Sequence, residues 1–220
     1  MKEILALLKK DLTLEWRNKY AFNGMLLYLV STVFICYLSF KTKANAINPI
    51  VWNTLFWIII LFTAINAIAK SFAQENKNRH AYYFTLASPE AVILSKLLYN
   101  FLLMLLLTFI GFGLYISFLE NPVQDMPYYL LAVLLGALGF TGTLTLVSGI
   151  AAKAENSGSL MALLSFPIII PMLLMLMRLS KNAMDGLDRG LSTDEIITLV
   201  GIDLIVIALS YILFPYLWKS

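Results

Sequence analysis

Few side chains in this sequence are of the types that carry out catalysis or bind metals. The single cysteine, Cys36, lies in an apolar run, and the single histidine, His80, stands beside Arg79. There is no H-E-x-x-H metal motif, no cysteine pair and no G-x-x-x-x-G-K-[ST] phosphate-binding loop. We therefore expect no catalytic residue, metal site, bound cofactor or ATP site in this chain.

Three polar residues within long apolar segments are the remaining candidates. Asp203 lies about two turns inside the last apolar segment, and a carboxylate in hydrocarbon is a functional candidate because burying its charge is costly. The alternative is a hydrated or hydrogen-bonded carboxylate near the outer interface. We expect Asn66 and Asn100, in other apolar segments, to form interhelical hydrogen bonds.

The composition shows what kind of structure must position these groups. The 220 residues are 60% hydrophobic and 13% charged, with a mean hydropathy of +0.81. Soluble domains are nearer half apolar and a quarter charged. The net charge of +3 is too small and too dispersed for a nucleic-acid partner. The chain is predicted to be a single integral membrane domain whose surroundings are the lipid bilayer.

Crossing about 30 Å of hydrocarbon takes about 20 apolar residues in a helix. No alternating strand pattern is present, so the sequence predicts an all-α bundle and not a β-barrel. Six segments of the required length are predicted to span the membrane: residues 20–40, 51–69, 92–119, 128–152, 160–179 and 196–218.

The distribution of basic residues predicts the orientation of these six spans. An even number of spans places both termini on one side, and eleven of the sixteen lysines and arginines fall on that side. Positive charge favours the cytoplasmic side. We therefore expect a multi-pass membrane protein with both termini in the cytoplasm.

Residues 1–19 form a predicted amphipathic helix in the headgroup plane before the first span. Leu5, Leu8 and Leu12 share an apolar stripe that Glu15 interrupts. The alternative is a short positively charged orientation signal without a role of its own.

Residues 70–91 form the longest predicted cytoplasmic connection. Its first half, from Glu75 to Arg79, is charged, and Tyr82 to Phe84 are aromatic. Ser88 and Pro89 then start a helix of about thirty residues, or about 45 Å, which is longer than the hydrocarbon is thick. This segment is predicted to dock onto a partner and pass force into the membrane. An interfacial aromatic anchor is the alternative.

Two later spans carry small residues and prolines at regular spacings. In the fourth span Gly136, Gly139 and Thr143 share a face and are predicted to allow close helix packing, within the chain or with a second copy. In the fifth, Pro167 and Pro171 predict a kink, which serves either as a gating hinge or as a static shape.

Together these features leave three classes of function. Proton-driven antiporters and intramembrane enzymes need buried acids, bases or nucleophiles, which are nearly absent here. A passive channel, a structural subunit and a permease driven by a partner remain. The predicted docking segment favours the partner-driven permease.

Several stretches of the sequence, in the same order, resemble one protein family. Residues 10–12 and 16–17 look like the opening of the haem exporter protein B (CcmB) family. Residues 82–96 are similar to its loop-to-third-helix signature, and residues 165–171 to its paired-proline fifth helix. Residues 153–160 fit the polar turn before that helix. At residues 74–79 the sequence departs from an acidic, Asp-Gly-containing pattern of better-known members.

The resemblance implies a type-2 ABC exporter permease of the bacterial inner membrane that acts in cytochrome c maturation and is paired as a homodimer. It implies an ATPase subunit (CcmA) that binds ATP and Mg²⁺, a haem-handling membrane protein (CcmC) and a periplasmic haem chaperone (CcmE). ATP hydrolysis would drive export of haem, the possible cargo, or release of the loaded chaperone. The alternatives are a structural assembly subunit, or an exporter permease for lipid or drug cargo. The expected ATPase-coupling residues are Glu75, Arg79, Tyr82, Tyr83, Phe84, Ser88, Pro89 and Lys96.

Overall fold

The computed structural model describes residues 2–17, 19–41, 47–68, 88–152 and 157–219. Within these ranges the chain is helical and contains no strand. The helices are α1 (Lys2–Arg17), α2 (Lys19–Lys41), α3 (Pro49–Ile68), α6 (Pro89–Leu119), α7 (Met126–Ala151), α8 (Ser157–Met184) and α9 (Thr193–Lys219), with a 3₁₀ turn, η1 (Arg189–Ser192), before α9.

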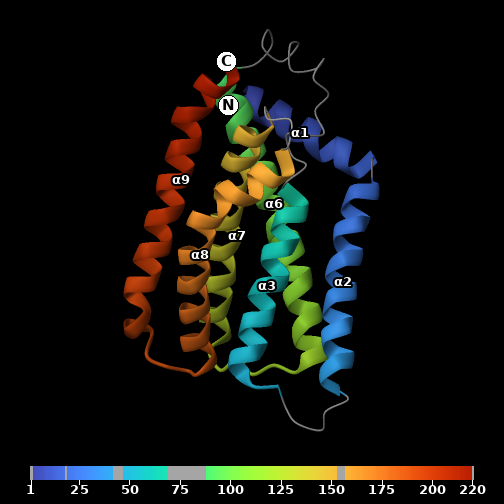
Figure 1. Cartoon of the computed structure of the whole chain (residues 1–220), viewed down its shortest axis with the longest axis vertical. Coiled ribbons are helices and arrows are strands. Elements are labelled where there is room, and N and C mark those ends of the chain that lie inside the picture. The colour runs from blue at the N-terminus through green and yellow to red at the C-terminus, as the bar shows by residue number, and fades with distance from the viewer. Residues whose placement is uncertain (1, 18, 42–46, 69–87, 153–156, 220) are drawn as a thin grey trace.

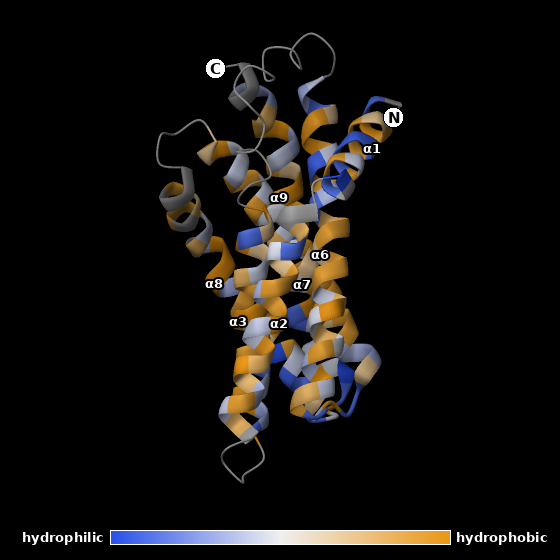
Figure 2. Ribbon diagram, turned by 90° about the vertical axis from the view of Figure 1, so that its right-hand side faces the viewer, coloured by the Kyte–Doolittle hydropathy of each residue, from blue (hydrophilic) through white to orange (hydrophobic). Residues whose placement is uncertain are grey.

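Six of these helices are long and apolar enough to cross a membrane, which confirms the predicted all-α membrane fold. The apolar spans cover Phe22–Phe40, Pro49–Ile68, Pro89–Leu119, Met126–Ala151, Leu163–Met184 and Arg189–Tyr216. Figure 1 shows the six helices side by side, with both chain termini at the same end of the bundle. We call this the terminal end. Figure 2 shows apolar residues along the length of the bundle.

The separate N-terminal helix predicted for residues 1–19 is present as α1. Figure 1 shows α1 running obliquely across the terminal end of the bundle. It contacts both α6 and α2.

Helix α7 is the centre of the bundle. It packs against α3, α6, α8 and α9. Of the residues in its most apolar stretch 78% are buried, compared with 17% in α2, which lies at the edge.

Small residues allow the close packing of α7. A Cβ at Gly136 would lie 2.5 Å from the ring of Trp57 in α3, and a Cβ at Gly139 would overlap the sulfur of Met172 in α8. Thr143 is also buried. The predicted small-residue face therefore packs against helices of the same chain at Gly136 and Gly139.

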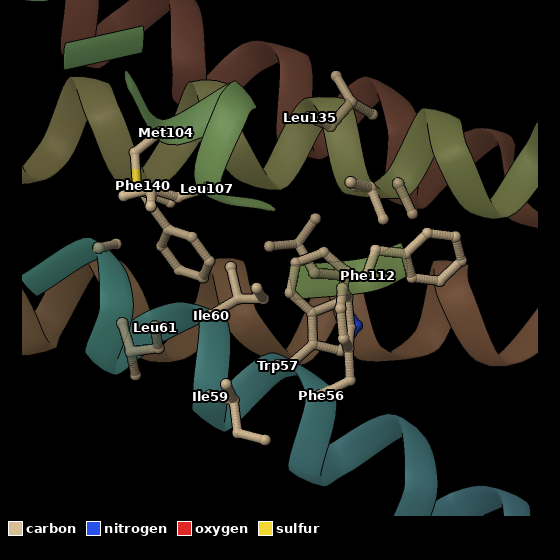
Figure 3. Packing of buried hydrophobic residues seen from close by; sticks show 14 of the residues in the cluster. Phe56, Trp57, Ile59, Ile60, Leu61, Met104, Leu107, Phe112, Leu135 and Phe140 are labelled. Carbon is tan, nitrogen blue, oxygen red and sulfur yellow. The ribbon is translucent and has the colours of Figure 1, made fainter. Parts of the chain in front are cut away.

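An aromatic cluster fills the space between α3, α6 and α7. The rings of Phe112 and Tyr129 stack with their centroids 5.2 Å apart, and Phe56 meets Phe112 edge-to-face at 5.5 Å. Figure 3 shows Phe56, Trp57 and Phe112 converging from two helices. Such offset and edge-to-face pairs add stabilisation beyond that of the buried area.

Helix α8 contains both prolines of the predicted kink, and both side chains are exposed. Proline lacks the N–H that would bond to the preceding turn and clashes with that turn, so it bends a helix. Figure 1 shows that α8 changes direction along its length. Whether the bend is a hinge stays a prediction.

Candidate coupling region and polar groups of the bundle

Only part of the predicted coupling segment lies in the described part of the chain. Glu75, Arg79, Tyr82, Tyr83 and Phe84 lie outside the described residues. The next residues start α6 as expected. The hydroxyl of Ser88 caps the helix by accepting a hydrogen bond from the backbone N–H of Ala91 at 3.3 Å, and Pro89 occupies its first turn.

Helix α6 has 31 residues, so it is about 46 Å long and exceeds the thickness of the hydrocarbon. Its first turns at the terminal end pack against α1. The predicted long helix after the coupling segment is therefore present.

A buried ion pair joins α1 to α6. The carboxylate of Asp11 lies 3.3 Å from the ammonium of Lys96 and 3.1 Å from that of Lys10. The side chains of Asp11 and Lys96 are each only 7% exposed. Lys96, expected among the coupling residues, therefore faces α1, and its part in coupling stays a prediction.

Two further polar contacts follow the same line between α1 and α6. The hydroxyl of Tyr99 donates to Oε2 of Glu15 at 2.9 Å, and the backbone N–H of Ser88 donates to Oε2 of Glu3 at 3.4 Å. Each partner lies 84 or 85 residues further along the chain. The two helices thus run alongside each other in the same direction. Glu15, which interrupts the apolar stripe of α1, has a specific partner in α6.

The two intramembrane asparagines differ. Asn100 in α6 is buried and donates a hydrogen bond to the hydroxyl of Thr145 in α7 at 2.9 Å, which is the expected interhelical bond. Asn66 is exposed, one turn from the end of α3, and within the described residues it makes no interhelical hydrogen bond. The interhelical hydrogen bond expected for Asn66 stays a prediction, and its side chain lies on the outward side of α3.

Asp203 on α9 is 6% exposed. A Cβ on Gly139 would come within 2.7 Å of its Oδ1, so the carboxylate reaches the backbone of α7. Neither carboxylate oxygen has a hydrogen-bond partner among the described residues. Both readings of Asp203, a functional carboxylate and a hydrated or hydrogen-bonded one, stay predictions.

A buried hydrogen-bond network, which the sequence analysis missed, joins α3, α7 and α8. Asn53 in α3 accepts from the hydroxyl of Tyr129 at 3.1 Å and donates to the carbonyl oxygen of Met177 at 3.0 Å. The indole N–H of Trp57 donates to the hydroxyl of Ser180 at 2.8 Å. The network fixes the register of the three helices.

At the end opposite the termini, Asp125 links two connections. Its carboxylate caps α7 and accepts two hydrogen bonds from the guanidinium of Arg189, with Nε 2.8 Å and Nη2 3.0 Å from its oxygens. These bonds from Arg189, together with the backbone N–H of Tyr128, hold the pKa of Asp125 below its usual value. The α6–α7 and α8–α9 connections are thereby fixed to each other.

Comparison with known proteins agrees with this architecture. The family model described as CcmB protein matches residues 2–216. The chain belongs to the CcmB family. No curated protein and no solved structure matches the chain.

Membership of the CcmB family gives the coarse function. The chain is the membrane component of an ABC-type haem export system in cytochrome c maturation, a multi-pass permease subunit and not itself an enzyme. ABC transporter components such as an ATPase subunit are implied as partners. The match also covers the segments on which the resemblance rests.

Proposed function

We propose that this permease couples ATP hydrolysis by a partner ATPase to export of haem or to release of a haem-loaded chaperone. The main support is the α1–α6 pair. Helix α6 follows the predicted coupling segment directly, is longer than the hydrocarbon and is fastened to α1 by the buried Asp11–Lys96 pair. A force applied at the terminal end would act on both helices together.

The orientation is part of the proposal. The uneven distribution of lysines and arginines along the sequence supports a cytoplasmic location of the terminal end, in an inner membrane. The ATPase, with its ATP and Mg²⁺, would dock there and grip the segment that contains Glu75, Arg79, Tyr82, Tyr83 and Phe84.

Motion would pass from α6 to the rest of the bundle through direct contacts. Asn100 bonds to Thr145 of α7, and α7 packs against both the proline-containing α8 and α9. Close-packed helices transmit displacement because they shift between discrete packed arrangements. The bend at Pro167 and Pro171 then provides a point at which α8 changes direction during transport.

The opposite end would meet the companion proteins. Leu187 and Leu191 are exposed there, on the connection held by the Asp125–Arg189 pair. We assign this surface to a CcmC-like haem-handling protein and a CcmE-like chaperone, with a second copy of the chain completing the permease.

The test of coupling is Tyr82→Ala combined with Tyr83→Ala. We expect the variant to lose co-purification with the ATPase and to lose cytochrome c maturation. The control is Tyr28→Ala, on α2 away from the terminal end, which should retain both. Persistence of both properties in the double variant would show that the coupling assignment is wrong.

A second test separates a permease from an assembly scaffold. The complex is rebuilt with an ATPase that binds nucleotide without hydrolysing it. A coupled permease loses cytochrome c maturation, whereas a scaffold retains it while the complex still assembles.

A further inference from the structure

Helix α1 separates its charged side chains between two faces. All three of its acids, Glu3, Asp11 and Glu15, contact α6. On the side away from α6, Lys9 and Arg17 are exposed and form no ion pair with any described residue. This side of α1 is therefore positively charged, although the helix also contains three carboxylates.

The same side of the helix is also apolar. Leu5 and Leu12 are 61% and 45% exposed, whereas Leu8 of the predicted apolar stripe packs inward on the core. Lys9 comes four residues after Leu5 and three before Leu12, so the three side chains share one face. We call Leu5, Lys9, Leu12 and Arg17 the outward face. Cations beside exposed leucines are typical of a helix that lies at a membrane surface.

The contacts with α6 place α1 at the depth of the lipid headgroups. Helix α6 is about 46 Å long, so about 16 Å of it lies outside about 30 Å of hydrocarbon. Its contacts with α1 run from Ser88 to Tyr99, and the eleven residues from Pro89 to Tyr99 also rise about 16 Å. Charged side chains are costly in hydrocarbon, so the part of α6 beside the charged α1 is the part outside it. Figure 1 shows α1 at this end of the bundle.

We propose that the outward face of α1 binds anionic phospholipid headgroups. Lys9 and Arg17 pair with the lipid phosphates, and Leu5 and Leu12 enter the bilayer between the headgroups. The acids of α1 do not oppose this contact, because they point toward α6. A zwitterionic lipid offers a phosphate without net negative charge, so the two cations favour an anionic surface. The proposal does not depend on the proposed transport function.

The experiment measures which lipid contacts this face of the full chain in mixed vesicles. The chain carries Cys36→Ser and Thr13→Cys, with a fluorophore on the introduced thiol, because Thr13 is exposed four residues from both Lys9 and Arg17. Quenching is compared between phosphatidylglycerol and phosphatidylcholine that carry the same spin label. A cation near an anionic surface contributes about fivefold in affinity, so phosphatidylglycerol should be favoured by about fivefold or more at low salt. The preference should shrink as the salt concentration rises.

Two double variants of the labelled chain locate the lipid contact. Lys9→Gln with Arg17→Gln should bring the quenching ratio of the two lipids close to one. Its unfolding midpoint in detergent should stay unchanged, because neither side chain has an ionic partner in the part of the chain that the structure describes. Arg178→Gln with Lys181→Gln is the control, since it removes the same charge from α8 near the opposite end. This control should retain the preference for phosphatidylglycerol.

Three results would contradict the proposal. Equal quenching by the two lipids with the outward face intact, as expected if this face docks on a partner protein instead, would overturn it. An unchanged ratio in Lys9→Gln with Arg17→Gln would do the same. An equal loss of preference in both double variants would show a general effect of net charge and would overturn the assignment to α1.

Discussion

The ammonium of Lys96 on α6 lies 3.3 Å from the carboxylate of Asp11 on α1, and both side chains are almost fully buried. Removing one partner of a buried pair leaves an uncompensated charge, which typically costs about 3–5 kcal/mol. Asp11→Leu is therefore expected to lower the stability of the α1–α6 unit by about 3 kcal/mol.

The measurement for this pair is the unfolding midpoint in detergent, compared among Asp11→Leu, Lys96→Met and the double variant. The double variant should recover most of the lost stability, because both charges of the buried pair are then removed together. Lys9→Ala, an exposed position on α1, is the control. Additive losses in the double variant would show that the two residues are not coupled.

The glycines of α7 provide a second prediction. Gly139→Ala should destabilise the bundle by about 1–3 kcal/mol, because the added methyl group would overlap Met172 and press on Asp203. Gly142→Ala is the matched control on the same helix, since its Cβ would meet Val206 at an ordinary 3.4 Å. Thermal unfolding of both variants checks this, and equal midpoints would contradict the described packing of α7.

The Asp125–Arg189 pair predicts a dependence of stability on pH. The pKa of Asp125 is lowered in the folded chain, mainly by its hydrogen bond with Arg189. The stabilisation is therefore fully present above the unfolded-state pKa of about 3.9 and is lost as the pH falls through the lower folded-state pKa.

The check is to compare thermal unfolding of the wild-type chain and Asp125→Asn from pH 7 to below pH 4. The wild-type chain should be more stable at neutral pH, and the difference should shrink at the acid end. A difference that stays constant at every pH would contradict an ionised Asp125 in this pair.

Asp203 yields a prediction about function. Asp203 is buried with no hydrogen-bond partner in the part of the chain that the structure describes, and carboxylates in membrane spans commonly serve transport. Asp203→Asn should fold at least as well as the wild-type chain and should reduce cytochrome c maturation. The control is Thr141→Val on α7, because the Thr141 hydroxyl is also buried and has no hydrogen-bond partner among the described residues. This variant should leave maturation unchanged. Wild-type levels of cytochrome c maturation in Asp203→Asn would show that the Asp203 carboxylate is not needed for function.

The six spans could be predicted because length and hydrophobicity alone decide which helices cross a bilayer. The docking of α1 on α6 could not be predicted, because its partners lie 84 or 85 residues apart. Glu15 reads in sequence as a flaw in an amphipathic helix, and only the position of Tyr99 explains it.

The sequence also did not show which polar side chains within the spans are buried and which are exposed. Asn66 and Asn100 looked alike as polar residues in apolar segments, yet one faces outward and the other bonds to Thr145. Asn53, Tyr129 and Ser180 gave no signal, because their positions in three separate helices follow no periodic pattern.

The enclosure of α7 by four neighbouring helices has a consequence for assembly. Gly136 and Gly139 of α7 already pack against Trp57, Met172 and Asp203 of the same polypeptide, which leaves no room for another subunit at these two positions. The proposed pairing of two permeases would instead use peripheral helices such as α2, which carries exposed apolar side chains.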